Sequence, residues 1–363
     1  MSPENRWQKL LISKLENSGS VEPLFIPDLR LWYRWHSDHD SLPFTSSDES
    51  LSDICSQIGV PEWKTVKPWN PESPGAEVEN EQTDSEQRRS ITVAGKTLTS
   101  SWTLGPDGDW WQAEYPAKSV EDLETVRNYV ERRNFVPDLQ AFSSVKSELA
   151  ERGIVAIELP AEPFAWLMLE IIGWSEGLML LMDAEEIVKS IIEISRKQIV
   201  SLVENLSAST SGEIFFSSDN LDGQFISPSY FDDFLAEGYR DVAGTVKKRG
   251  GFLLTHCGGP AGRLLGPLNE AGVSGVAGIC APPQGDTSLA EARERAKELA
   301  LWGGIAQNYL LPTDSTEDLD RSIDDAISFS GTDPGVIIGI ADHVPLEADP
   351  DRLRRIAERC GYG

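Results

Sequence analysis

Residues 251–259 read GFLLTHCGG, and residues 335–343 read GVIIGIADH. In each stretch a glycine precedes a short apolar run, and the run ends in a polar segment that contains a histidine. Short runs of this kind are typical of strands in a parallel sheet, whose two faces are both covered. Amphipathic stretches separate these runs from similar ones, so the second half of the chain predicts consecutive βα units.

The same pattern extends through most of the chain. Six runs predict the strands Gly153–Glu158, Glu213–Ser217, Gly251–Thr255, Gly275–Ile279, Leu299–Gly303 and Gly335–Ile340. A seventh strand is predicted near Phe25–Trp32, and the sequence does not place an eighth. We therefore predict an α/β fold, specifically a (β/α)8 TIM barrel with an N-terminal extension and a β-hairpin insertion. Prolines that follow Ser227 and Asp349 predict the first turns of two outer helices.

The length of 363 residues suits one barrel that carries an insertion, so residues 1–363 are interpreted as a single domain. Residues 1–24 are expected to form a short lead-in helix. Residues 61–116 are interpreted as a loop and hairpin insertion over one barrel mouth. Within them, Glu72–Arg89 is acidic and poor in apolar residues, which predicts a mobile loop. Residues 90–102 alternate around Gly95-Lys96, which predicts a β-hairpin.

Composition limits the partners. The chain has 59 acidic and 32 basic residues and a net charge of −27, which disfavours nucleic acid and anionic lipid. No apolar run approaches the roughly 18 residues that a membrane-spanning helix needs. The N-terminus lacks the pattern of a secretory signal, and the four cysteines are widely spaced, as is typical of reduced thiols. We expect a cytoplasmic protein that binds a small molecule.

Polar side chains follow the predicted strands, and in a barrel the residues after the strands converge on one face. These residues are Asp219, Asn220, His256, Cys257, Cys280, Asp286, Asp342 and His343. The N-terminal arm adds Arg34 beside several aromatic residues.

Three interpretations of these residues stay open. In the first, imidazole and thiolate side chains bind zinc, which would keep a substrate thiol nucleophilic; the ligands would be His256, Cys257, Cys280 and His343. In the second, Asp219, His256 and Asp342 carry out proton transfer without a metal. In the third, the carboxylates cap turns and the cysteines are small buried hydrophobic residues.

Several segments also carry a family resemblance. They are LRLWYRWHSDHDSLP (29–43), SSDNLDGQFISPSYFDDF (217–234), LLTHCGG (253–259), APPQGD (281–286), LWGGI (301–305) and GVIIGIADHVPLEADPDRL (335–353). In this order they resemble the uroporphyrinogen decarboxylase superfamily. The resemblance implies a single (β/α)8 barrel, often a homodimer. It also implies one of two chemistries: decarboxylation of a porphyrinogen without metal, or methyl transfer linked to a corrinoid protein, often with zinc holding the acceptor thiol.

We favour the methyltransferase-like branch, because an acidic chain is poorly matched to a porphyrinogen that carries eight carboxylates. The expected enzyme moves a methyl group between a small methylated compound and a corrinoid partner or thiol acceptor, with the corrinoid supplied by the partner. The alternative is a cofactor-free carboxy-lyase that acts on a porphyrinogen or a smaller carboxylic acid. The expected catalytic residues are Asp219, His256 and Asp342, and the expected substrate-binding residues are Arg34, Asn220 and Asp286. The zinc motif His-x-Cys-Gly is not restored in either register of Thr255-His256-Cys257-Gly258.

Overall fold

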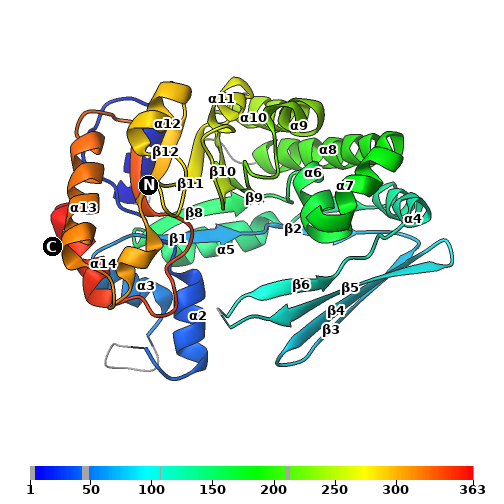
Figure 1. Ribbon diagram of the computed structural model, residues 1–363, viewed down its shortest axis with the longest axis horizontal. Coiled ribbons are helices and arrows are strands. Elements are labelled where there is room, and N and C mark those ends of the chain that lie inside the picture. Colours follow the sequence, from blue (N-terminus) through cyan, green and yellow to red (C-terminus); the bar gives the residue numbers. More distant parts are fainter. Residues whose placement is uncertain (1–4, 43–48, 107, 209–212, 363) are drawn as a thin grey trace.

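A curled parallel sheet forms the centre of the computed structural model, which describes residues 5–42, 49–106, 108–208 and 213–362. Its seven strands lie in the order β1-β8-β9-β10-β11-β12-β13, and all neighbours are parallel (Figure 1). The strands are β1 (Glu62–Val66), β8 (Gly153–Glu158), β9 (Ile214–Leu221), β10 (Phe252–Cys257), β11 (Gly275–Ile279), β12 (Ala300–Ile305) and β13 (Val336–Ile340). The α/β, TIM-barrel-like fold class is therefore confirmed.

The segment before residue 30 lies beside the last strand. Phe25 forms an isolated parallel bridge with Ile338 on β13. Two backbone hydrogen bonds hold it there, from Ile26 N to Ile338 O (3.0 Å) and from Ile338 N to Leu24 O (2.8 Å). The prediction of a strand over Phe25–Trp32 is wrong at its C-terminal end, because helix α2 (Arg30–Asp38) already begins at Arg30.

Side chains alternate across the strands between two apolar cores. On β8, Ile154 and Ala156 belong to an inner cluster, whereas Val155 and Ile157 pack toward the surrounding helices. This period of two is what a sheet covered on both faces requires. Helix α1 (Arg6–Leu15) adds buried leucines to the inner cluster and so closes one end of it. α1 lies within the predicted lead-in segment 1–24, of which residues 1–4 fall outside the described ranges.

Helices connect the strands and cover the outside of the sheet (Figure 1). Besides α1 and α2, the α-helices are α3 (Leu51–Ile58), α4 (Val120–Val130), α5 (Leu139–Leu149), α6 (Pro163–Trp166), α7 (Trp174–Asp183), α8 (Glu185–Ala208), α9 (Pro228–Tyr230), α10 (Ala236–Lys247), α11 (Leu265–Glu270), α12 (Leu289–Arg295), α13 (Thr316–Ser330) and α14 (Pro350–Arg359). Shorter helical segments are the π-helices η1 (Leu167–Ile172) and η2 (Phe231–Leu235) and the 3₁₀-helix η3 (Gln307–Leu310). Both predicted proline starts are confirmed, since Ser227 and Asp349 cap α9 and α14 with their side chains.

The region predicted as an insertion divides into two parts. Its first part is β1, a strand of the central sheet, so the interpretation of residue 61 as the start of an insertion is wrong. Its second part is a four-stranded antiparallel sheet in the order β3-β4-β5-β6, which lies beside the central parallel sheet and its helices in Figure 1. The strands are β3 (Ala76–Gln82), β4 (Glu86–Val93), β5 (Lys96–Leu104) and β6 (Trp110–Glu114). Two further strands, β2 (Trp69–Glu72) and β7 (Asn134–Pro137), pair with each other. In the chain, β2 leads from β1 into the antiparallel sheet and β7 leads from that sheet back to β8.

The predicted hairpin is present as β4 and β5. Its turn is Ala94-Gly95, one residue earlier than predicted, and both residues have positive φ (52° and 81°), as a type I′ turn requires. The prediction that Glu72–Arg89 is a mobile loop is wrong, because β3 and the first half of β4 occupy it. Charged side chains alternate there on an exposed antiparallel pair, and sequence composition does not distinguish that arrangement from a loop.

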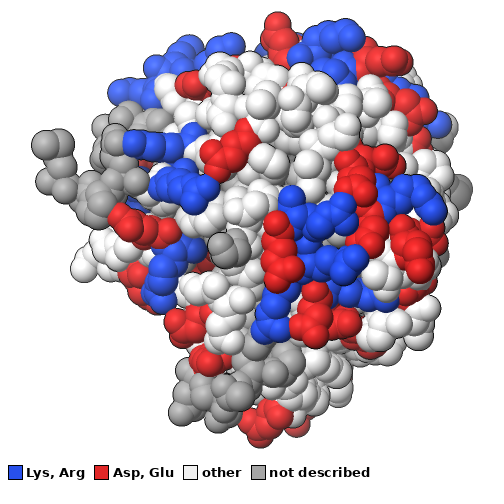
Figure 2. All heavy atoms as spheres, turned by 90° about the vertical axis from the view of Figure 1, so that its left-hand side faces the viewer, with Lys and Arg blue, Asp and Glu red and all other residues white. Residues whose placement is uncertain are grey.

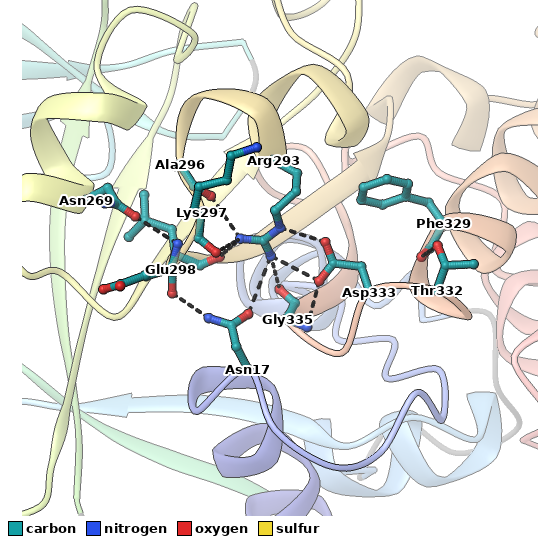
Figure 3. A network of polar contacts seen from close by, with 11 residues as sticks. Asn17, Asn269, Arg293, Ala296, Lys297, Glu298, Phe329, Thr332, Asp333 and Gly335 are labelled. Carbon is teal, nitrogen blue, oxygen red and sulfur yellow. Dashed lines mark hydrogen bonds and ion pairs between the residues drawn. The ribbon is translucent and has the colours of Figure 1, made fainter.

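The guanidinium of Arg293 bonds to several groups at the end of the parallel sheet where its strands begin. Arg293 on α12 donates to both carboxylate oxygens of Asp333 (2.6 and 3.1 Å) and to the carbonyls of Ala296 and Leu299 (2.9 and 2.8 Å). Figure 3 shows that Asn17, which follows α1, joins the same network. These contacts tie α12 and α1 to the starts of β12 and β13.

The surface around α13 and α14 carries both acidic and basic side chains. Figure 2 views the face that carries α13 and α14, and there acidic and basic side chains are interspersed. Exposed ion pairs such as Arg355–Asp320 (2.6 Å) join the two helices. Within the described ranges, no single helix is long and apolar enough to cross a membrane; the sharply bent pair 163–172 and 177–183 passes that test only when both halves are taken together.

Candidate active site

A cavity of about 550 Å³ opens at the carboxyl ends of the strands. Its apolar base is formed by Trp63, Phe216 and Trp302, which also belong to the inner core cluster. Its polar lining comes from Asp28, Arg30, Arg34, Asp109, Ser218, Asn220, His256, Asp342 and His343. In barrel enzymes this end of the sheet is where substrates react.

Two imidazoles share one carboxylate in this cavity. Asp342 Oδ1 lies 3.5 Å from His256 Nε2 and 3.4 Å from His343 Nδ1. Burial favours the neutral carboxyl of Asp342, but its hydrogen bonds to the two histidines outweigh burial and lower its pKa below the usual range. The hydrogen bond to Asp342 in turn raises the pKa of His343. The arrangement therefore favours the protonated form of the His343 imidazole, which faces the cavity.

Two guanidiniums stand beside the imidazoles. Arg30 forms a bidentate pair with Asp28 (2.9 Å from Nε, 2.6 Å from Nη2), and this pair, against the opposing effect of burial, raises the pKa of Arg30. Arg34 is exposed at the mouth and donates to the carbonyl of Gly108 at 3.3 Å. A planar guanidinium in this position suits a carboxylate or phosphate of a ligand.

The strand ends are irregular where the polar side chains emerge. Register shifts occur on β10 between Thr255 and Cys257 and on β11 between Ala277 and Ile279. Gly278 permits the second one, since its φ is 97° and a Cβ there would lie 1.9 Å from the carbonyl oxygen of Cys257. Bulges of this type redirect side chains next to active sites.

Two lining residues also have strained backbones. Asn220 and Asp342 both have positive φ, 49° and 72°. The left-handed region is unfavourable for residues with a side chain, by about 1–2 kcal/mol, although Asn and Asp tolerate it best. Such strain collects at functional sites, and both residues lie just beyond or at the end of a strand in the cavity.

The antiparallel sheet contributes to the mouth of this cavity. The β5–β6 turn brings Asp109 to the lining and Gly108 to Arg34. The turn is packed closely, because a Cβ on Gly108 would lie 2.7 Å from the ring of Trp35 and 3.3 Å from Leu346. The position of the predicted insertion over a barrel mouth stays a prediction, and the contact with the cavity is made by the β5–β6 turn.

No family model matches the sequence. No curated protein matches it either. Among solved structures, a methyltransferase from Methanosarcina mazei is similar over 99% of this chain and 99% of its own, with a TM-score of 0.59 and 12% identity. A protein described as a vitamin-B12 independent methionine synthase from Listeria monocytogenes matches 62% of this chain and 69% of its own, with a TM-score of 0.40 and 12% identity. The first likeness supports the barrel-like fold; membership of the uroporphyrinogen decarboxylase superfamily stays a prediction.

The cavity brings together five of the residues that the sequence singles out. They are Arg34, Asn220, His256, Asp342 and His343. The resemblance segment 29–43 supplies Arg34 from α2, and Pro43 at its end lies outside the described residues.

Asp219 does not belong to this site, so the expectation that it meets His256 and Asp342 in one cavity is wrong. Its side chain is 1% exposed and accepts hydrogen bonds from Ser217 Oγ (2.8 Å), Glu162 N (2.8 Å), Thr255 Oγ1 (3.2 Å) and the Tyr239 hydroxyl. Successive residues of a strand face opposite sides, so Asp219 points toward the helices while its neighbours on either side face the cavity.

The predicted zinc ligands do not converge. His256 and His343 face the cavity, but Cys257 is buried in the outer core and Cys280 lines a separate cavity of about 520 Å³ between α12 and α13. Burial raises the pKa of Cys280 to about 11 and that of Cys257 further, which disfavours the thiolate that zinc requires. Within the described ranges, no group of three or more His, Cys, Asp or Glu side chains is arranged so that it could hold a metal ion. These four residues do not fit one zinc ion.

The prediction that Asp286 binds substrate is wrong for this cavity, because Asp286 does not line it. It is exposed and accepts a hydrogen bond from Gly262 N (3.0 Å), so it supports a loop. The sequence prediction in turn misses Asp28, Ser218 and Asp109 as lining residues. Ser218 could have been found from strand alternation, since it precedes Asp219 on β9. Asp109 could not, because it reaches the cavity from a separate sheet.

The network around Asp219 leads to a prediction about stability. Glu162 is buried and accepts from the N–H groups of Phe164 and Ala165 (2.8 and 3.0 Å). Burial, and next the charge of Asp219, raise the pKa of Glu162 well above its ordinary value. Its contribution to folding is therefore fully present below the ordinary pKa and is lost as the pH rises through the folded-state pKa.

Glu162→Gln, which stays neutral, is expected to melt at a higher temperature than the parent at pH 8 and at a similar temperature at pH 4. Thermal melts followed by circular dichroism test this. Glu121→Gln is the control, because the Glu121 side chain is 83% exposed. Equal effects of the two substitutions at pH 8 would contradict the assignment.

Proposed function

We propose that this protein is a methyltransferase-like enzyme that takes a methyl group from a small methylated acid. The observation that carries the proposal is the pair of imidazoles on one carboxylate, next to Arg34 in one cavity. The likeness to the Methanosarcina methyltransferase over the full chain supports the direction of the proposal. The methyl acceptor would be a thiol or a corrinoid carried by a partner protein, which supplies the nucleophile.

Five of the lining residues then have a task. Arg34 binds the carboxylate of the donor, and the apolar base made by Trp63 and Trp302 receives its methylated part. As the acceptor takes the methyl group, the bond between that carbon and its oxygen or nitrogen breaks, and the electron pair stays on the heteroatom. His343 gives its proton to that atom, and Asp342 holds the imidazolium in place beforehand.

A second candidate is a cofactor-free decarboxylase. Two observations favour it. The predicted zinc ligands lie in different places, and Arg34, His256 and His343 do meet in one cavity. In this reaction the carboxylate leaves as carbon dioxide, and the same His343 protonates the carbon that keeps the electron pair. Both candidates thus use one proton donor and differ in the bond that breaks.

One assay distinguishes the two. The purified protein is incubated with a panel of O- and N-methylated carboxylic acids and with reduced free cobalamin as the probe acceptor. We expect methylcobalamin to form, with no release of carbon dioxide. Carbon dioxide release without acceptor would instead support the decarboxylase, and the absence of both products across the panel would count against the two candidates.

The pKa shifts predict the pH dependence of either reaction. Asp342→Asn removes the carboxylate that raises the pKa of His343, so the imidazolium persists over a narrower range. The alkaline limb of the pH–rate profile is therefore expected to move to lower pH in the variant. A limb that stays in place would show that His343 is not the proton donor.

We further propose that the sheet closes into a (β/α)8 barrel, with residues 24–26 between β13 and β1. The bridge from Phe25 to β13 supports this closure. So does the hydrogen bond from Arg30 Nη1 to Thr65 Oγ1 on β1. Ile26 and Trp63 also share the inner core cluster.

A further inference from the structure

Besides the candidate active site and the cavity that Cys280 lines, another cavity of about 330 Å³, here called the second cavity, lies between the antiparallel sheet and the parallel sheet with its helices. One wall comes from β4 and β5, and the other comes from the end of β8, from α6 and η1, and from α8. Aromatic side chains make up much of its lining, namely Trp69, Trp102, Tyr129, Phe135 and Trp166. The function proposed above makes no use of this cavity.

One cation is fixed between two of these rings. The guanidinium of Arg133 lies 4.8 Å from the ring centroid of Phe135 and 4.8 Å from that of Trp166. It also donates to Ser195 Oγ (3.0 Å) and Gln198 Oε1 (3.2 Å). These two hydrogen-bond partners are neutral and orient the guanidinium without neutralising it, and the negative charge of Glu170 offsets part of its positive charge.

A second guanidinium is close by and incompletely bonded. Arg89 Nη2 lies 3.4 Å from the hydroxyl of Tyr129, a long contact, and among the described residues its buried Nε has no hydrogen-bond partner. Burial lowers the pKa of Arg133 to about 10, and the positive charge of Arg89 acts in the same direction. A buried donor without a partner is unfavourable unless a ligand or water satisfies it.

Cationic side chains outnumber acidic ones in this cavity, whereas the whole chain is strongly acidic. Its lining holds three cationic side chains, Lys67, Arg89 and Arg133, and two acidic ones, Glu158 and Glu170. Burial raises the pKa of Glu170, and the positive charges of Arg89, Lys67 and Arg133 act in the opposite direction. Glu158 is already paired with Lys67 at 3.3 Å. In a protein of net charge −27, a locally cationic and aromatic cavity is suited to an anion.

The second cavity adjoins the candidate active site. Ser218 lines both cavities, and its hydroxyl donates to Glu158 Oε1 at 3.3 Å. A molecule held between Arg89 and Arg133 would therefore lie on the far side of Ser218 from the imidazoles.

We propose that this second cavity binds a small anionic molecule with an aromatic ring, its carboxylate or similar anion on Arg89 and Arg133 and its ring against the tryptophans. The unpartnered Nε of Arg89 supplies the donor, and Trp102 and Trp166 supply flat apolar surface. The site does not depend on which reaction the first cavity carries out.

The test uses 1-naphthoate as the probe and 1-naphthamide as its uncharged counterpart. Binding to the full chain is measured by calorimetry and by the change in tryptophan emission. We expect naphthoate to bind at least about tenfold more tightly than naphthamide and to weaken as salt is added. Equal affinity for the two compounds would overturn the proposal.

Variants locate the probe. Arg89→Gln is expected to weaken naphthoate binding by about tenfold or more. Arg88→Gln is the matched control, because Arg88 is next to it on β4 but 55% exposed and paired with Glu86. Lys67→Gln, at a side chain that is 60% exposed, gives a smaller loss and serves as a second variant if Arg89→Gln folds poorly.

Arg34→Gln separates this proposal from the function of the first cavity. It should leave naphthoate affinity unchanged while it impairs turnover. Naphthoate binding that is lost in Arg34→Gln and kept in Arg89→Gln and Lys67→Gln would place the probe in the first cavity and contradict the proposal.

Discussion

Arg293→Met is expected to lower the free energy of unfolding by about 3–5 kcal/mol, the usual effect of breaking a buried ion pair by removing one partner. The Arg293 and Asp333 side chains are only 17% and 13% exposed. The substitution leaves the carboxylate of Asp333 without its bidentate partner and leaves the carbonyls of Ala296 and Leu299 without a donor (Figure 3). Chemical denaturation followed by circular dichroism measures the loss.

Arg359→Met is the matched control for this experiment. Arg359 pairs with two carboxylates, Asp320 and Asp324, where Arg293 pairs with one, and it does so on the exposed surface between α13 and α14. Exposed pairs contribute roughly 0–1 kcal/mol, so we expect a much smaller change. Similar losses in the two variants would mean that the Arg293 network is not what holds α12 and α1 to the strand starts.

His343→Gln is expected to reduce turnover by about 10²–10⁴-fold, the range that general acid catalysis contributes. Glutamine keeps a polar group of similar size facing Asp342 but cannot deliver a proton at neutral pH. The measurement is the steady-state rate on the donor that the cobalamin assay identifies. Because the substitution leaves Arg34 in place, KM should change far less than kcat.

His39→Gln serves as the control for the histidine substitution. His39 lies at the end of α2, is exposed, and stacks on Trp35 with ring centroids 4.0 Å apart. It should keep the parent rate. If His343→Gln retains more than a tenth of the parent activity, the proton must come from elsewhere in the cavity, with His256 the first side chain to test.

The sequence predicts the strands of the second half well because each is a short apolar run that is buried on both faces. β1 is missed for a physical reason. Its sequence, EWKTV, contains two charged residues and lies between prolines, so its hydropathy is that of a loop. Its place in the sheet is set by pairing with β8, from Glu62 beside Gly153 to Val66 beside Ile157. Glu62 is buried and bound by Ser52, a contact that local sequence does not reveal.

The sequence predicts only part of the candidate site, because local pattern locates strand ends but not the contacts between distant segments. Identifying strand ends is enough to find His256 and Asp342, because both follow strands that are easily recognised. Choosing among neighbouring residues also requires knowing which face of the strand each occupies. Of these three neighbours only Asp219 has an ionisable carboxylate, but Ser218 and Asn220 are the residues that face the cavity. Arg89 and Asp109 lie beyond such reasoning, because a separate sheet carries them.

The β5–β6 turn at the mouth has an evolutionary consequence. His256 and Asp342 lie at the ends of strands of the parallel sheet, whereas Asp109 and the carbonyl that Arg34 contacts belong to a sheet inserted in the chain between β1 and β8. Changes in the length of its β5–β6 turn alter the mouth without changing the strand pairing of the parallel sheet, to which the antiparallel sheet adds no strand. Related chains can therefore differ in which compounds the mouth admits while they keep the same cluster of His256, Asp342 and His343.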